Sequence, residues 1–240
     1  MALILVMASI PPVRALAEPS PGGRPRSAAF RGALGSRQIS GADVKLTLRI
    51  YNYVPIDPVT LLRAEKITAT IFEDAGIETV WMDCTPLPGQ LRPDPVCPSD
   101  MGASDLVLRF LPRRMAMKVP TPNEPLGFAQ QCPETEPACE LTVFYFRVDE
   151  LASEGYRAET ILGHVIAHEM AHVLIGPGHS DDEIMRREWS REELRRMSLG
   201  LQLGFTRDQS PQIRQAVLRR VKPPTPESAT FSAQKRPIGR

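Results

Sequence analysis

The chain has 240 residues, of which 42% are hydrophobic and 24% charged, and its formal net charge is +1 at pH 7. This length allows one domain of about 150–180 residues with flanking tails, which is enough chain to bury a core. The nearly balanced charge, with no basic run interleaved with aromatic residues, argues against binding to nucleic acid or to a membrane surface.

The N-terminus has the pattern of a secretory signal peptide over residues 1–17. Residues 3–10 form an apolar run that is too short to span a membrane, and residues 15–17 (Ala-Leu-Ala) supply an A-x-A cleavage site. Because no Lys or Arg precedes the run, an N-terminus without a targeting role is the alternative. We expect a secreted or periplasmic protein with no membrane association once the signal peptide is removed.

Composition divides the rest of the chain into four parts. Residues 18–42 are rich in Pro, Gly, Ser and Arg, which predicts a linker or a short pro-segment. Residues 43–185 contain the periodic apolar segments of a folded domain. Residues 186–221 predict a small helical C-terminal subdomain, and residues 222–240 a disordered tail.

The first elements of the folded domain have clear sequence signals. Residues 44–53 alternate apolar and polar side chains, as a strand does. Asp57 is suited to cap a helix that begins at Pro58, and the apolar stripe of this helix ends at Gly76. Further strands are expected at 77–82, at 105–111, at an edge position over 126–130 and, as a strongly apolar central strand, at 141–148.

The four cysteines predict two disulfides if the protein is exported. They are Cys84, Cys97, Cys132 and Cys139, and none forms a C-x-x-C pair, which argues against a structural zinc site. Three connectivities are possible. We favour Cys84–Cys97 with Cys132–Cys139, because each bond would then close a Pro-rich loop; in a protein that stays inside the cell the thiols would be free.

All four histidines lie in one stretch of the chain. His168 and His172 belong to an H-E-x-x-H segment, so in a helix they share one face and can bind one Zn²⁺, with Glu169 beside the open position. A Gly-Pro-Gly turn at 176–178 ends the helix and brings His179 back as the third ligand. His164 lies one turn earlier, and we interpret it as a neighbour of the site, because a fourth imidazole would exclude water.

This segment resembles the signature of the metzincin clan of zinc peptidases, H-E-x-x-H-x-x-G-x-x-H followed by a methionine turn. His168, Glu169, His172 and His179 match it, and Met185 would be the turn methionine below the metal. One extra residue precedes Gly176, so Asp182 or Glu183 is the alternative third ligand. His179-Ser180 is similar to the matrixin branch.

The resemblance implies a fold and an activity. The fold would be α+β and zincin-like, with a mixed twisted sheet, a long active-site helix and the helical C-terminal subdomain. The activity would be hydrolysis of peptide bonds by zinc-activated water, with Glu169 as general base. A monomer would bind a peptide or protein substrate along the edge strand, and Arg186, Arg187 and Trp189 could shape its side-chain pocket.

Two other functions fit the same residues. One is a zinc-binding interaction module without catalytic activity, although the presence of Glu169 argues against it. The other is a zinc hydrolase that acts on a non-peptide amide. A core helix with ordinary hydrogen-bonded histidines is the alternative to any metal site.

Beyond the histidines, two helices of the C-terminal subdomain have start signals. Ser190 and Glu193 have the spacing of a capping box for a helix that ends near Leu199. Ser210 and Pro211 predict a second helix that runs to about Arg220.

Overall fold

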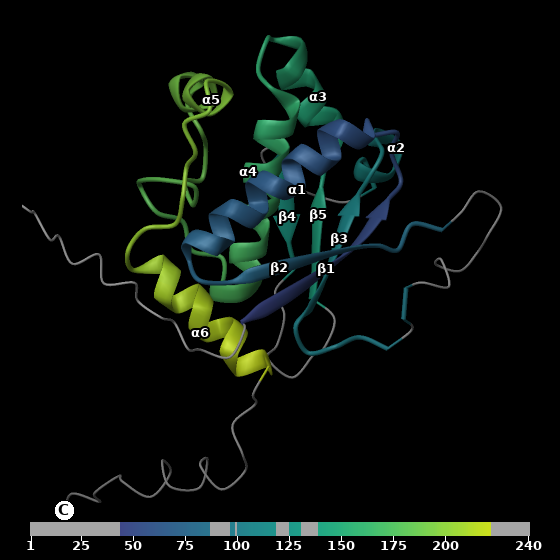
Figure 1. Ribbon diagram of the computed structural model, residues 1–240. Helices are drawn as coiled ribbons and strands as arrows, with labels where there is room; N and C mark the ends of the chain where they lie inside the picture. The colour runs from purple at the N-terminus through teal and green to yellow at the C-terminus, as the bar shows by residue number, and fades with distance from the viewer. Residues whose placement is uncertain (1–43, 87–96, 99, 119–124, 131–138, 222–240) are drawn as a thin grey trace, which may run out of the picture. The chain divides into compact units, whose positions relative to one another are not determined.

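A computed structural model describes residues 44–86, 97–98, 100–118, 125–130 and 139–221 (Figure 1). All of them lie in one compact unit, Gly41–Arg240. The predicted signal peptide, the linker or pro-segment, the C-terminal tail and Cys132 lie outside these residues.

Five strands form one mixed sheet in the order β2-β1-β3-β5-β4. β1, β2, β3 and β5 run parallel, and β4 pairs antiparallel with β5 at one edge. The register places Leu48 of β1 opposite Trp81 of β2 and Leu106 of β3. The strands are β1 (Lys45–Asn52), β2 (Glu78–Asp83), β3 (Asp105–Phe110), β4 (Gly127–Ala129) and β5 (Cys139–Val143).

Helix α1 (Pro58–Asp74) begins as its sequence predicts. The Asp57 carboxylate accepts the backbone N–H of Thr60 at 2.8 Å, which satisfies one of the free donors of the first turn, and Pro58 has no N–H to satisfy. Gly76 follows the helix with a positive φ of 75°, where a side chain would be strained.

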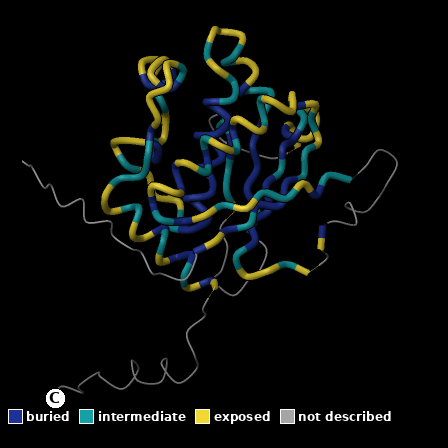
Figure 2. The backbone as a smooth tube through the Cα atoms, in the orientation of Figure 1, coloured by how far each residue is buried: buried dark blue, intermediate teal, exposed yellow. Residues whose placement is uncertain are grey.

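The helix that carries the histidines, α4 (Ala158–Ile175), lies against α1 and is buried over its whole length from Thr160 to Leu174 (Figure 2). The two helices approach closely at Gly163, where a Cβ atom would lie 2.8 Å from Ala64 O. The Thr68 hydroxyl donates to Gly163 O at 2.9 Å across the same crossing. This close approach holds α4 against α1, while α4 also packs on β4 and β5.

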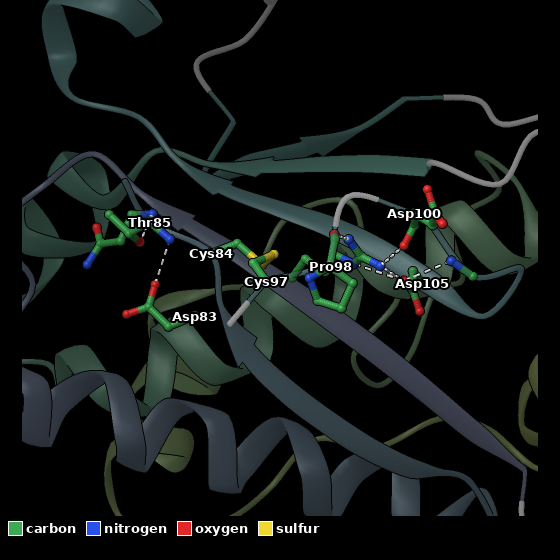
Figure 3. Close-up of a disulfide and its surroundings, with 10 residues drawn as sticks. Asp83, Cys84, Thr85, Cys97, Pro98, Asp100 and Asp105 are labelled. Carbon is green, nitrogen blue, oxygen red and sulfur yellow. Dashed lines mark hydrogen bonds and ion pairs between the residues drawn. A yellow bond between two sulfur atoms is a disulfide. The ribbon is translucent and has the colours of Figure 1, made fainter. Parts of the chain in front are cut away.

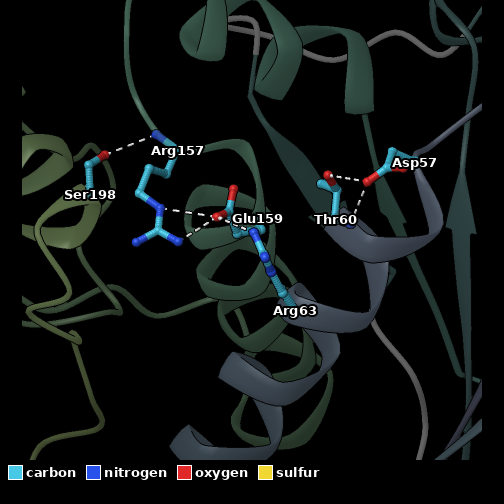
Figure 4. Close-up of polar contacts among 6 residues, drawn as sticks. All are labelled: Asp57, Thr60, Arg63, Arg157, Glu159 and Ser198. Atoms are coloured by element: carbon cyan, nitrogen blue, oxygen red, sulfur yellow. Dashed lines mark hydrogen bonds and ion pairs between the residues drawn. The ribbon is translucent and has the colours of Figure 1, made fainter.

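Charged contacts hold the exposed start of α4 (Figure 4). Glu159 lies 2.6 Å from Arg157 and 3.6 Å from Arg63 of α1, and the Arg157 backbone N–H donates to Ser198 Oγ. The guanidinium of Arg157 lowers the pKa of Glu159, although partial burial of the carboxyl acts in the opposite direction. The first turn of α4 is thereby tied to both neighbouring helices.

A buried ion pair joins β1 to β3 and lies next to a disulfide (Figure 3). Arg49 Nε donates to Asp105 Oδ2 at 2.8 Å, and its other nitrogens donate to the carbonyls of Pro98 and Asp100. The predicted Cys84–Cys97 disulfide is confirmed. Cys139 is also disulfide-bonded, but its predicted partner Cys132 lies outside the described residues.

The strand predicted at 141–148 is wrong over its second half. β5 ends at Val143, and residues 145–153 form helix α3 (Tyr145–Ser153). Tyr145 and Val148 are spaced three apart and both pack toward the core, which is helical and not strand spacing. The mostly apolar segment at 141–146, in which Thr142 is the polar exception, hides this change of period. β5 is also not central, since only β4 lies beyond it.

The predicted C-terminal helices are present as α5 (Arg191–Ser198) and α6 (Gln209–Val221). The Ser190 hydroxyl accepts the Glu193 N–H, and the Glu193 carboxylate accepts the Ser190 N–H at 2.7 Å, so the capping box forms. A short helix, α2 (Arg113–Ala116), follows β3 and was not predicted from the sequence. Among the described residues, no helix combines the length and apolar character that a membrane span needs.

The fold class predicted from the sequence is confirmed: a mixed sheet, a long helix that carries the H-E-x-x-H segment, and helices at the C-terminal end.

Candidate metal centre

The C-terminal end of α4 presents the two histidines of the H-E-x-x-H segment. His168 and His172 are one turn apart, and their rings meet edge to face with centroids 4.6 Å apart. Gly176 ends the helix with φ 93° and ψ −176°, a conformation that favours glycine. The chain then turns back, and it carries His179 to the two helical rings.

The structure brings the three predicted ligands together. One nitrogen from each of His168, His172 and His179 lies within 4.8 Å of the others. The ring of His179 lies 5.5 Å from that of His168 and 4.7 Å from that of His172. Among the described residues, neither Asp182 nor Glu183 joins this group, so the extra residue before Gly176 does not displace His179.

Backbone carbonyls orient both helical imidazoles. His168 Nδ1 lies 2.8 Å from Ile184 O, and His172 Nδ1 lies 2.9 Å from Gly176 O. A carbonyl oxygen can only accept, so each Nδ1 must carry the proton, and in a neutral ring each Nε2 then presents a lone pair. Ordered ligand histidines in zinc sites are held in this way.

The two Nε2 atoms are directed at one point. Those of His168 and His172 lie 2.9 Å apart. Two lone pairs at this distance repel each other unless a cation or a proton lies between them. Three neutral imidazoles that converge on one point are the donor set of a catalytic zinc site with a fourth position open, so these residues fit Zn²⁺.

Burial keeps the three rings neutral. It lowers the pKa of His168 to about 4, although the hydrogen bond to Ile184 acts in the opposite direction. Burial also lowers the pKa of His172 and of His179, and the Arg187 charge lowers that of His179 further. A neutral imidazole is the form that binds a metal ion, so these lowered pKa values favour binding.

Glu169 lies next to His168 on the side of α4 that faces the edge strand. It is only 6% exposed, and its side chain packs against Gly127 of β4. Burial raises the pKa of its carboxyl group to about 8. A buried carboxyl with a raised pKa, adjacent to a metal ligand, has the character of an acid–base group.

The segment after His179 supports the site from below. Met185, predicted as the turn methionine, is fully buried, and its carbonyl accepts the Ser180 N–H at 2.9 Å. The carbonyl of the preceding Ile184 accepts from both His168 Nδ1 and Trp189 Nε1. The Trp189 ring also meets the His168 ring edge to face at 5.9 Å. Trp189 therefore supports a candidate metal ligand.

The two arginines that we expected near the pocket differ. Arg186 Nη1 lies 2.7 Å from Glu193 Oε1 and belongs to the capping of α5. Arg187 is exposed, and its charge contributes to lowering the pKa of His179. Arg186 is therefore engaged with α5, whereas Arg187 is the arginine that acts on a candidate metal ligand.

His164 takes a structural role. Its Nδ1 lies 2.7 Å from Thr160 O, and its Nε2 accepts the backbone N–H of Leu203 at 3.0 Å. Both ring nitrogens are therefore used within the protein, and His164 has none left for a metal ion. This agrees with its interpretation as a neighbour of the site.

Two supporting residues were not predicted from the sequence. Ile184 acts through its carbonyl, which no pattern of side chains reveals. Gly127 lies 42 positions before Glu169, and only the pairing of β4 with β5 brings it there. A glycine inside a predicted edge strand was the one available signal.

No protein-family model matches the sequence, and no curated protein matches it. Solved structures to which it is similar include archaemetzincin from Methanopyrus kandleri, with a TM-score of 0.44 and 15% identity over 75% of this chain and 100% of that one. Another is a zinc-dependent peptidase from Methanocorpusculum labreanum, with a TM-score of 0.41 and 19% identity over 70% of this chain and 99% of that one. The interpretation of the site depends on the geometry of the three histidines and Glu169.

Proposed function

We propose that the chain is a secreted zinc-dependent endopeptidase. The observation that carries this proposal is the convergence of His168, His172 and His179, whose ligand nitrogens lie within 4.8 Å of one another. The carbonyl-bonded Nδ1 atoms of the two helical rings support it, because they leave both Nε2 lone pairs directed at one point. Glu169 supplies the carboxyl group that hydrolysis needs.

Zn²⁺ bound by the three imidazoles would act as a Lewis acid and make a nucleophile of water near neutral pH. Glu169 is the general base: the positive charge of a bound Zn²⁺ would oppose the effect of burial and favour the ionised carboxylate. That carboxylate accepts a proton from the attacking water and delivers it to the nitrogen of the leaving amine. Its burial against β4 excludes bulk water from the carboxylate, so the proton passes to the leaving group and not to solvent. Met185 is fully buried, and we propose that it forms the floor of the site.

The edge strand β4 offers a place for an extended substrate. Phe144 N–H donates to Leu126 O, and Gln130 N–H donates to Glu140 O, each at 2.9 Å. In an antiparallel pair, bonding to the neighbour alternates along the strand, so the N–H and C=O groups of Gly127 and Ala129 point away from β5. A peptide that adds a strand there would pass Glu169.

Secretion rests on the sequence of residues 1–17. Expression in a host with a secretory pathway, followed by N-terminal sequencing, tests it. Mature protein that begins after Ala17 would support export, and an uncleaved chain retained in the cytosol would contradict it.

The activity is tested with purified protein that contains one zinc per chain. Wild type and Glu169→Ala are incubated with casein and with a quenched peptide library. We expect cleavage by wild type and loss of at least about 100-fold in the variant, as for removal of a general base. Zinc binding without cleavage in either sample would favour the interaction module. Turnover of small acylated amides alone would favour the non-peptide hydrolase.

A further inference from the structure

We propose that Gly127 is the positioning residue for Glu169: the missing side chain at this place on β4 sets where the carboxylate lies. This inference rests on the proposed role of Glu169 as general base. Gly127 lies on the edge strand, 42 positions before Glu169 in the sequence, and it helps to place this proton acceptor.

The contacts around Gly127 leave no room for a methyl group. A Cβ atom built on Gly127 would lie 2.9 Å from Glu169 Cγ and 3.0 Å from Glu169 Oε1. It would also lie 2.8 Å from the backbone oxygen of Thr142 on β5. Carbon atoms in ordinary contact are about 3.5–4.0 Å apart, so the backbone of β4 already touches the stem of Glu169.

The backbone conformation does not explain the glycine. Gly127 is absent from the described glycines with positive φ, which are Gly76, Gly155, Gly176 and Gly200. It is the first residue of β4, where glycine loses more entropy and packs less surface than other residues. A glycine is needed here because a side chain would not fit. Of the three atoms nearest to the added Cβ, two belong to Glu169.

If a methyl group were added, one of the neighbours would have to move. Thr142 O belongs to the backbone of an interior strand and is held by the sheet, whereas Glu169 has side-chain torsions that can change. The carboxylate of Glu169 would therefore be displaced from its position beside the metal ligands. Misplacement of a catalytic group by about 1 Å can reduce the rate about 100-fold.

The test is Gly127→Ala with Gly204→Ala as control, because a Cβ on Gly204 has no neighbour within 4 Å and its φ is not positive. Zinc content, kcat and KM are measured on a quenched peptide. For Gly127→Ala we expect one zinc per chain, a KM within about 3-fold of wild type and a kcat lowered about 10–100-fold. Gly204→Ala should match wild type in all three.

Rescue separates positioning from a general effect on the strand. In the Glu169→Asp background a Cγ atom remains, but the contact with Oε1 is removed, so the added methyl group meets less of the side chain. Gly127→Ala should then lower kcat by a smaller factor, relative to Glu169→Asp alone, than it does in wild type. An equal loss in both backgrounds, or no loss in the first, would overturn the proposal.

A stability cycle tests the contact even if wild type cleaves no peptide. Gly127→Ala should lower Tm, and the shift should be smaller in the Glu169→Ala background, where Cγ and Oε1 are gone and only the contact with Thr142 O remains. Equal Tm shifts in the two backgrounds would show that Gly127 and Glu169 are not coupled. If wild type cleaves no peptide but the two Tm shifts differ, the endopeptidase proposal is refuted. The contact between Gly127 and Glu169 would still be established.

Discussion

His164 and His168 lie one turn apart on α4, yet they use their Nε2 atoms in opposite ways. His164 Nε2 accepts the N–H of Leu203 at 3.0 Å, whereas His168 Nε2 faces the Nε2 of His172 at 2.9 Å. One ring therefore anchors the segment before α6, and the other contributes a lone pair to the candidate metal centre. The two histidines should respond differently to the same substitution.

His168→Ala or His172→Ala should lower the zinc content from one per chain to none, because each removes one of three ligands. His164→Ala should retain the zinc and lower the free energy of unfolding by about 1–3 kcal/mol, since it leaves a buried backbone N–H without a partner. Elemental analysis and urea unfolding measure the two effects. Loss of zinc from the His164 variant alone would contradict this division of roles.

The third ligand is tested separately, because it lies on a loop with one residue more than the metzincin pattern. His179→Ala should lose its zinc as His168→Ala and His172→Ala do, since only two imidazoles remain in each variant; competition with a chelator measures the loss against wild type. Asp182→Asn should bind zinc as wild type does. If the Asp182 variant loses the metal and the His179 variant keeps it, the carboxylate is the ligand.

The sequence was sufficient for the parts of the site that depend on local structure. His168, Glu169 and His172 lie within five residues of one helix, so helical geometry alone places them on one face. Asp57 with Pro58, and Ser190 with Glu193, are helix starts for the same local reason. The pairing of Cys84 with Cys97 spans only 13 positions.

Sequence was not sufficient where the apolar period changes or where contacts are distant. The run from Leu141 to Phe146 gives no sign that β5 ends at Val143, because a short apolar run is compatible with strand and helix alike. The contact between Gly127 and Glu169 depends on the antiparallel pairing of β4 with β5. The carbonyl of Ile184 has no side-chain signature at all.

The buried ion pair of Arg49 with Asp105 should be important for stability. The two side chains are 5% and 9% exposed, and Arg49 also holds the carbonyls of Pro98 and Asp100 beside the disulfide. Asp105→Ala would leave the guanidinium buried without its counter-ion, and we expect a loss of about 3–5 kcal/mol. Urea unfolding measures it.

The matched control is the exposed pair of Arg113 with Glu150, whose side chains are 64% and 56% exposed. Glu150→Ala should cost less than about 1 kcal/mol, because solvent screens this pair. Equal losses in the Asp105 and Glu150 variants would mean that burial does not strengthen the Arg49 pair.

The raised pKa of Glu169 predicts a pH-dependent stability of the protein after its metal is removed by a chelator. In the folded chain the pKa is raised to about 8 by burial, against an ordinary value of 4.5. Between these values the folded state binds a proton that the unfolded state has lost. The contribution of this carboxyl group to the free energy of unfolding is therefore complete below pH 4.5 and is lost as the pH rises to about 8.

The variant Glu169→Gln has no such proton. Relative to wild type, this variant should gain on the order of a few kcal/mol between pH 5 and pH 9. Urea unfolding of both chelated proteins at several pH values measures the difference, in which the shared effect of the buried histidines cancels. If the difference stays constant over that range, Glu169 is ionised in the folded chain and its carboxylate is not desolvated by β4.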